Sequence, residues 1–176
     1  SETSPNLPQR IALIGQANTA NQATIPGEPV LISSAKVAGD IFGYGSPIHQ
    51  AARMLKPIYS DGVGAIPVYA YPQDKSPAGT ALVMAINVTG TATANATHNT
   101  VIAGRSSIDG EGYSYDVLKD DTATIIAGKI ADSINGVISC PFIAVATTSS
   151  VELTSKFADA CAGDLKLEMS TGTNGV

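Results

Sequence analysis

The segment 11–15 has the residue types that could begin a phosphate-binding loop. The apolar run IALI is followed by Gly15 and small polar residues, as IALIGQANTA over 11–20. A dinucleotide-binding fingerprint needs GxGxxG, because its glycines tighten the turn, admit the pyrophosphate and let the helix pack. Here only the first glycine is present, Pro26 and Pro29 follow in place of a helix, and no GxxxxGK[ST] motif occurs. Gly15 is therefore predicted to end a buried strand and not to hold a phosphate.

The histidines are the next candidates for catalysis. His49 and His98 are the only two in the sequence. His49 shares the polar stripe of a predicted helix with Arg53 and Lys56, so we expect it on a solvated face. A serine nucleophile would need a partner histidine, but GxSxG does not occur and neither histidine has an obvious carboxylate partner in sequence.

Carboxylates could act as a catalytic pair or as metal ligands. Asp120 and Asp121 form the tightest pair, but they precede a predicted helix, whose dipole favours negative charge at that end. The segment DGEG, 109–112, has oxygen ligands for calcium but lacks the remaining positions of an EF-hand loop, so a hairpin turn is predicted. No clustered Cys, His and carboxylate spacing suggests a transition metal. We expect no catalytic, metal or cofactor-binding residues; the enzyme alternative is a small α/β hydrolase or transferase using Asp120, Asp121 or His49.

The cysteines do not form a redox or metal motif. Cys140 and Cys161 are the only two, and they are not arranged as CxxC. Two cysteines in a chain of 176 residues are ordinary for buried cytosolic thiols. Free thiols are therefore expected, with a disulfide as the open alternative.

Composition narrows the function classes further. The chain is 44% hydrophobic and 14% charged with a net charge of −5, and it has no basic block for nucleic acid. Its apolar stretches are too short to cross a bilayer, and SETSPNLPQR does not resemble a secretory signal. A carbohydrate-binding or adhesive module would need exposed aromatic side chains. The tyrosines around Tyr113 could supply a pair, although sugar stacking favours Trp and none is present.

The elements that would position these residues form two groups. In the first, 1–9 is a predicted arm, 10–16 a buried strand, 17–29 a polar loop and 30–34 a second strand. Ser33 or Ser34 caps a helix that Gly43 ends, and Ser46 caps the next helix with Pro47 in its first turn. That second helix is predicted to have an apolar face of Ile48, Ala52, Leu55 and Tyr59. The last strand, 65–71, is predicted to end at Pro72.

The second group follows a linker at 72–80. Strands are predicted within 81–94, 99–107, 113–118, 142–149, 151–157 and 164–170. Tyr113, Tyr115 and Val117 should share one strand face. A helix at 121–138, capped by Asp121 or Thr122, should bury Ile126, Ile130, Ile134 and Val137. The expected fold is α+β, with lobes at 10–75 and 80–172, each a mixed β-sheet packed with one or two helices.

Read in order, these segments resemble the N-terminal half of contractile-tail sheath proteins of Mu-like bacteriophages. The stretches that carry the resemblance are RIALIGQA, VLISSAKVAGDIFGYGSPIHQAARML, GVGAIPVYAYP, INVTGTATA, DDTATIIAGKIADSINGVI and VELTSKFADACAGDLKLEM. Together they cover about 8–170. Each motif is weak alone, because it is small, apolar and glycine-rich; their order and spacing carry the likeness.

The resemblance implies a structural, non-enzymatic subunit of the virion tail, assembled in the bacterial host cytoplasm. Sheath subunits stack around a tail tube and rearrange to drive the tube through the host envelope, without nucleotide hydrolysis. Their partners are neighbouring sheath subunits, joined by exchanged strands, and the tail tube. Sheath proteins continue into a large C-terminal domain that is absent here. The chain is therefore expected to be a fragment that is monomeric alone, with 80–172 as an inserted outer lobe.

Overall fold

The computed structural model describes residues 8–74, 79–103, 111–158 and 165–170. The chain divides into two compact units, Ser1–Lys75 (unit 1) and Ser76–Val176 (unit 2). Each unit has a separate cluster of buried apolar side chains. Both combine helices with small sheets, which confirms the α+β class. Within the described ranges, no helix has the length and apolar character needed to span a membrane.

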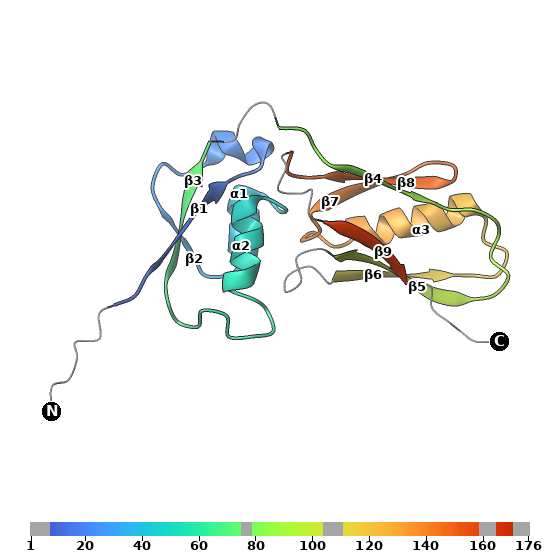
Figure 1. The fold of residues 1–176 in the computed structure, drawn as a ribbon, viewed down its shortest axis with the longest axis horizontal. Coiled ribbons are helices and arrows are strands. Elements are labelled where there is room, and N and C mark those ends of the chain that lie inside the picture. Colours follow the sequence, from blue (N-terminus) through green and yellow to red (C-terminus); the bar gives the residue numbers. More distant parts are fainter. Residues whose placement is uncertain (1–7, 75–78, 104–110, 159–164, 171–176) are drawn as a thin grey trace. The chain divides into compact units, whose positions relative to one another are not determined.

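Unit 1 is a three-stranded mixed sheet with helices on one side. Its elements are β1 (Ile11–Gln16), the 3-10 helix η1 (Thr19–Thr24), β2 (Val30–Ile32), α1 (Ala35–Phe42), α2 (Pro47–Leu55) and β3 (Val68–Gln73). The strand order is β1-β3-β2, with β1 parallel and β2 antiparallel to the central β3. Both α-helices lie on the same side of the sheet (Figure 1). Their core includes Ile32, Phe42, Ile48, Val68 and Ala70.

The predicted helix boundaries in unit 1 are confirmed by their capping contacts. The Ser34 hydroxyl accepts a hydrogen bond from the Val37 N–H at 3.3 Å, and the Ser46 hydroxyl accepts one from the His49 N–H at 3.2 Å. Pro47 occupies the first turn of α2, where its missing N–H leaves no bond unmade. Gly43 ends α1 with φ +90°, a conformation that favours glycine.

Three predictions for the strands and loop of unit 1 were wrong. β1 is not a buried strand: its exposure alternates, and Ile14 is 68% exposed. The segment 17–29 is not all loop, because it contains η1. β3 does not end at Pro72 but continues to Gln73. Since β2 pairs only with Val68–Ala70, the missing N–H of Pro72 removes no bond to β2.

The apolar face predicted for α2 is correct only for the residues inside the helix. Ile48 and Ala52 are fully buried, and Leu55 packs at the edge of the core. The helix ends at Leu55, shortly before Pro57, which cannot continue it. Tyr59 therefore leaves the predicted face and is 98% exposed.

Unit 2 consists of two antiparallel sheets with one helix between them. Its elements are β4 (Val83–Asn87), β5 (Ala96–Ala103), β6 (Glu111–Val117), α3 (Ala123–Asn135), β7 (Phe142–Ala146), β8 (Ser150–Ser155) and β9 (Lys166–Ser170). The strand orders are β4-β8-β7 and β6-β5-β9. α3 packs on β7 and β8 of one sheet and on β6 of the other (Figure 1). The single mixed sheet predicted for this lobe is therefore replaced by two antiparallel ones.

The helix of unit 2 is shorter than the predicted 121–138. Its buried stripe is Ala127, Ile130, Ala131 and Ile134, with Ile126 only partly buried. Val137 lies beyond the last helical residue, Asn135, and is 37% exposed. The predicted strand face of Tyr113, Tyr115 and Val117 is confirmed, since all three side chains lie in the core.

The C-terminal end of α3 also protects the β7 edge of the β4-β8-β7 sheet from pairing with another strand. β7 is an edge strand of the β4-β8-β7 sheet. The Asn135 side-chain amide donates to the Ala144 carbonyl at 2.7 Å, and its oxygen accepts from the Ala144 N–H at 3.0 Å. One side chain thus satisfies both backbone groups that Ala144 turns away from β8, which blocks strand addition at this point.

Candidate functional site

The segment FGYGS, residues 42–46, joins α1 to α2 and contains two glycines in the left-handed region of φ. Gly43 and Gly45 have φ of +90° and +86°. The Asn18 N–H donates to the Phe42 carbonyl at 2.8 Å, and the Asn18 side chain donates to the Tyr44 carbonyl at 2.8 Å. A Cβ at Gly43 would collide with the Asn18 side chain. The junction therefore ties the end of β1 to both helices.

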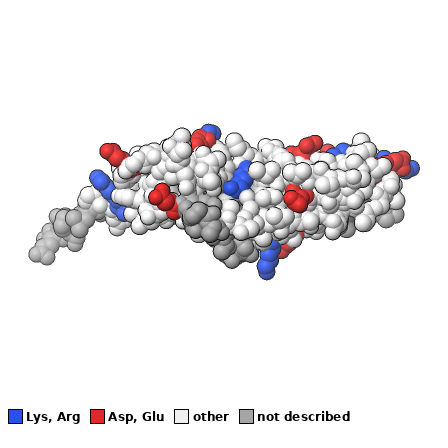
Figure 2. Space-filling model, turned by 90° about the horizontal axis from the view of Figure 1, so that it is seen from above, with Lys and Arg blue, Asp and Glu red and all other residues white. Residues whose placement is uncertain are grey.

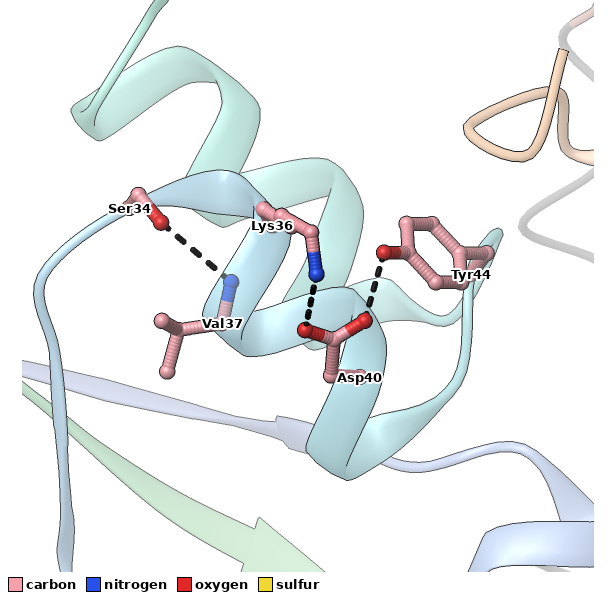
Figure 3. A network of polar contacts seen from close by, with 5 residues as sticks. All are labelled: Ser34, Lys36, Val37, Asp40 and Tyr44. Atoms are coloured by element: carbon pink, nitrogen blue, oxygen red, sulfur yellow. Dashed lines mark hydrogen bonds and ion pairs between the residues drawn. The ribbon is translucent and has the colours of Figure 1, made fainter.

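Tyr44 links this junction to the exposed side of α1. Its hydroxyl donates to Asp40 at 2.6 Å, and Lys36 donates to the other oxygen of Asp40 at 2.6 Å (Figure 3). The hydrogen bond from Lys36, followed by that from Tyr44, lowers the pKa of Asp40 from its usual value. Exposed pairs of this kind contribute little to stability, so the network orients Tyr44 more than it holds the fold together.

His49 is buried, which corrects the prediction of a solvated face. Its side chain is 1% exposed, and its Nδ1 accepts a hydrogen bond from the Gly45 N–H at 3.0 Å. The Tyr44 ring contacts it edge-on, with ring centroids 5.0 Å apart. The helical period alone placed His49 beside Arg53 and Lys56, but the junction folds back over this turn of α2 and covers it. The sequence signal for this burial is Gly45. It lies four residues before His49, and a glycine there lets the backbone turn so that its N–H reaches the imidazole.

The Asp121 side chain makes structural contacts in unit 2, and the Asp120 N–H donates to the Ala92 carbonyl at 2.9 Å. The Asp121 carboxylate accepts from Lys129 at 2.6 Å and from the Leu118 N–H at 2.8 Å. The same contacts, with Lys129 the larger cause, lower the pKa of Asp121. Asp121 therefore does not cap α3 through its side chain; Thr122 holds the N-cap position without a side-chain bond to the helix. Asp120 has φ +71° in the turn before α3.

The residues of the enzyme alternative are divided between the two units, and two of them have structural contacts within their own unit. His49 lies in unit 1, whereas Asp120 and Asp121 lie in unit 2. His49 already accepts the Gly45 N–H, and Asp121 is paired with Lys129. Among the residues that the structure describes, no group of three or more His, Cys, Asp or Glu side chains could hold a metal ion.

The tyrosine pair suggested for an adhesive surface is buried. Tyr113 and Tyr115 are 2% and 8% exposed, so they cannot form a sugar-binding platform. Burial, followed by contacts with Cys140 and Glu111, raises the pKa of Tyr113 far above its usual value. Burial is also the main cause that raises the pKa of the Cys140 thiol, which is free.

Some candidate residues lie partly or wholly outside the described ranges. Cys161 is one, so its predicted free thiol remains a prediction. The proposed turn at 109–112 is described only from Glu111, which already belongs to β6. The Glu111 carboxylate accepts a hydrogen bond from the Tyr113 hydroxyl at 3.0 Å.

The surface has few charges and differs between the two sheets of unit 2. On the face that Figure 2 shows, charged side chains occur singly or in small groups, with wide stretches of uncharged surface between them. The outer face of β6-β5-β9 is polar: Thr97 donates to Asp116 at 2.7 Å, and Ser114 donates to Asn99 at 3.4 Å. The outer face of β4-β8-β7 is mainly apolar around the carboxylate of Glu152. Its exposed residues include Val83, Ala85, Ile143 and Val145.

Comparison with known proteins finds a similarity to a phage tail sheath protein. The chain is 28% identical over 153 residues to the Mu-like prophage FluMu tail sheath protein of Haemophilus influenzae. The aligned part is 87% of this chain but 29% of the relative, so the chain spans less than a third of that protein. No protein-family model matches the chain. The similarity confirms the resemblance to Mu-like tail sheath proteins inferred from the sequence.

Proposed function

We propose that this chain is part of a structural subunit of a contractile phage tail sheath. The observation that carries the proposal is the similarity to a tail sheath protein along 87% of the chain. The proposed partners are neighbouring sheath subunits and the tail tube. The proposed location is the virion tail, after assembly in the bacterial host cytoplasm.

The proposed activity is mechanical and not catalytic. Sheath subunits would pack in a stretched, metastable assembly and rearrange into a shorter one that drives the tube through the host envelope. The free energy would come from the change in subunit packing, as in other strain-release switches. The structural contacts of His49 and Asp121 support this reading, because each group is engaged in holding its own unit.

The chain is proposed to be a fragment of a longer sheath polypeptide. The relative is much longer than the aligned part, and its remaining sequence would include segments that join subunits and contact the tube. Residues 80–172 would then form an inserted outer lobe. The fragment alone should be monomeric, because strands exchanged between subunits would be supplied by the missing segments.

Assembly of the full-length protein tests this function. The complete open reading frame should extend well beyond Val176 and lie next to a tail-tube gene. Its product should form long tubes of stacked rings in negative-stain micrographs, whereas the 176-residue chain should remain a monomer in analytical ultracentrifugation. A stop codon directly after Val176 would contradict the sheath proposal.

A ligand screen tests the non-enzymatic part separately. Thermal-shift measurements with ATP, NAD and divalent transition metals should leave the unfolding temperature unchanged, since a ligand that binds only the native state raises it. A reproducible rise of several degrees with any of these ligands would support the hydrolase or transferase alternative instead.

A further inference from the structure

The sheet of unit 1 has an apolar face that no described element of this unit covers. α1 and α2 pack on the face that contains Ile32, Val68 and Ala70. The opposite face, called the open face below, consists of Ala12, Ile14, Leu31, Tyr69 and Tyr71. Ile14 is 68% exposed, Leu31 51% and Tyr71 41%.

The residues of the open face form one continuous patch. In the strand register, Tyr69 of the central strand lies between Ala12 and Leu31. Tyr71 lies beside Ile14 one step further along. Paired residues in a sheet point to the same side, so these five side chains are neighbours.

A parallel strand with one uncovered face is unusual. Strands of all-parallel sheets are normally covered on both faces, and they are apolar at successive positions and do not alternate with polar residues. In the mixed sheet of unit 1, the parallel pair is β1 and β3. β1 has this composition, because all four residues of Ile11–Ile14 are apolar. The sequence of β1 thus suits burial on both sides, whereas the described structure buries only one.

The open face contains a hollow that has the cationic side chain of Arg10 beside it. A cavity of about 360 Å³ is lined by Arg10, Ile11, Ala12, Pro29, Tyr69 and Tyr71. The Arg10 guanidinium lies 5.7 Å from the centroid of the Tyr69 ring. Such a hollow suits an apolar side chain, and the guanidinium beside it suits a carboxylate.

We propose that the open face is covered by an amphipathic helix from a part of the longer sheath polypeptide that this chain lacks. Apolar residues of that helix would pack on Ile14, Leu31 and Tyr71, with an acidic residue near Arg10. The inference rests on the proposed function, because that function supplies the longer polypeptide. The relative supports the same view, since more than two thirds of it has no counterpart in this chain.

The size of the open face favours a segment of the same polypeptide over a second copy. Three strands about 4.8 Å apart, each with up to six residues that rise about 3.3 Å, give the open face a flat footprint of roughly 300 Å². A stable complex between separate proteins buries about 800 Å² on each partner, well above that area. A covering helix in the same chain does not have to overcome the entropy of association.

Oxidative footprinting of the two polypeptides tests the covering directly. Hydroxyl-radical labelling should modify Ile14 and Tyr71 in the 176-residue chain. Labelling of both should fall several-fold in the protein expressed from the complete open reading frame. Tyr59, also in unit 1, lies in the segment after α2 and is 98% exposed; it is the matched control and should label similarly in both. Equal labelling of Tyr71 in the two proteins would overturn the inference.

A charge on the open face gives a second, independent measurement. Ile14→Arg should shift the unfolding temperature of the 176-residue chain by no more than about 2 °C, because the side chain is exposed there. In the longer protein the same change should lower it by several degrees. Met54→Arg, on the exposed side of α2, should be neutral in both. Neutrality of Ile14→Arg in the longer protein would contradict the proposal.

Two further results separate this inference from its alternatives. If the short chain forms a concentration-dependent dimer that Ile14→Arg abolishes, a second copy covers the face and the proposal is wrong. Tube formation reports only on the proposed function. A longer protein that protects Tyr71 but forms no tubes would support the covering helix while contradicting the sheath assignment.

Discussion

Unit 1 and unit 2 bury their apolar side chains in different ways. In unit 2, α3 lies between two sheets, and residues from β4 to β8 reach one common core around Ile130 and Ile134. In unit 1, two helices cover one face of a single sheet, and apolar side chains such as Ile14 remain exposed on the other. The difference is what we expect if, as proposed above, additional polypeptide covers the open face of unit 1.

The two units also differ in where their side-chain polar contacts lie. Unit 2 uses Asn135 to close part of the β7 edge, and Lys129 to neutralise Asp121. Unit 1 concentrates its buried polar groups at the helix junction, where Asn18 and His49 hold the backbone of FGYGS. The predictions below therefore test the core and the Asp121 ion pair in unit 2, and the helix junction in unit 1.

The largest expected effect is the unfolding of unit 2 by the substitution Ile130→Asp. Ile130 is 1% exposed on the central stripe of α3, and an unpaired buried charge costs about 3 kcal/mol or more. Hydrogen exchange should show rapid exchange throughout unit 2, while peptides from unit 1 keep their protection. The control is Ile125→Asp on the same helix, where the side chain is 46% exposed and the effect should be small. Simultaneous loss of protection in both units would show that they do not fold separately.

The next effect should come from Gly43→Ala in unit 1. An alanine there would have to adopt φ +90°, and its Cβ would collide with the Asn18 side chain. Backbone strain alone costs about 1–3 kcal/mol. Urea denaturation should show a lower midpoint for unit 1, with Gly27→Ala as the control, because a Cβ at Gly27 meets no atom within 4 Å. An unchanged midpoint would mean that the junction adapts without cost.

His49→Leu should destabilise unit 1 by a similar or smaller amount. The change removes the acceptor of the Gly45 N–H in a buried position, and an unsatisfied buried donor costs about 1–3 kcal/mol. His49→Asn tests the mechanism, because a side-chain oxygen can accept the same hydrogen bond and should recover part of the loss. Both variants can be compared with wild type by calorimetry. Equal stability of His49→Leu and wild type would show that the hydrogen bond from the Gly45 N–H does not stabilise unit 1.

Local sequence signals predicted most of the elements. Ser34, Ser46, Pro47 and Gly43 set helix ends through contacts within a few residues, so the sequence contains the necessary information. The alternation at Tyr113 and Tyr115 likewise predicted the buried face of β6. These features depend on the chain immediately around them.

Features that depend on distant segments were not predictable from the same signals. The buried position of His49 requires the junction to fold back over α2. To predict the uncovered face of β1, one must know which elements lie on each side of the sheet. The run Ile11–Ile14 indicates only that both faces of the strand are apolar. The two-sheet arrangement of unit 2 depends on β9 pairing with β5, far away in sequence. Periodicity describes a single element and does not determine its partners.

The smallest expected effect is the pH dependence that Asp121 gives to unit 2. The hydrogen bond from Lys129, followed by that from the Leu118 N–H, holds the pKa of Asp121 below its usual value of 3.8. A carboxyl with a lowered pKa in the folded state stabilises the fold above its unfolded pKa, and this contribution is lost as the pH falls through the folded value. The stability difference between wild type and Asp121→Asn should therefore be largest near neutral pH and shrink on acidification below about pH 4. Urea midpoints of unit 2 measured across this range provide the test.

Asp132→Asn on the exposed side of α3 is the control, and it should not reproduce the effect. Asparagine can still accept the Leu118 N–H, so the comparison isolates the charge; a difference that stays constant or grows on acidification would show that the contact with Lys129 does not stabilise unit 2.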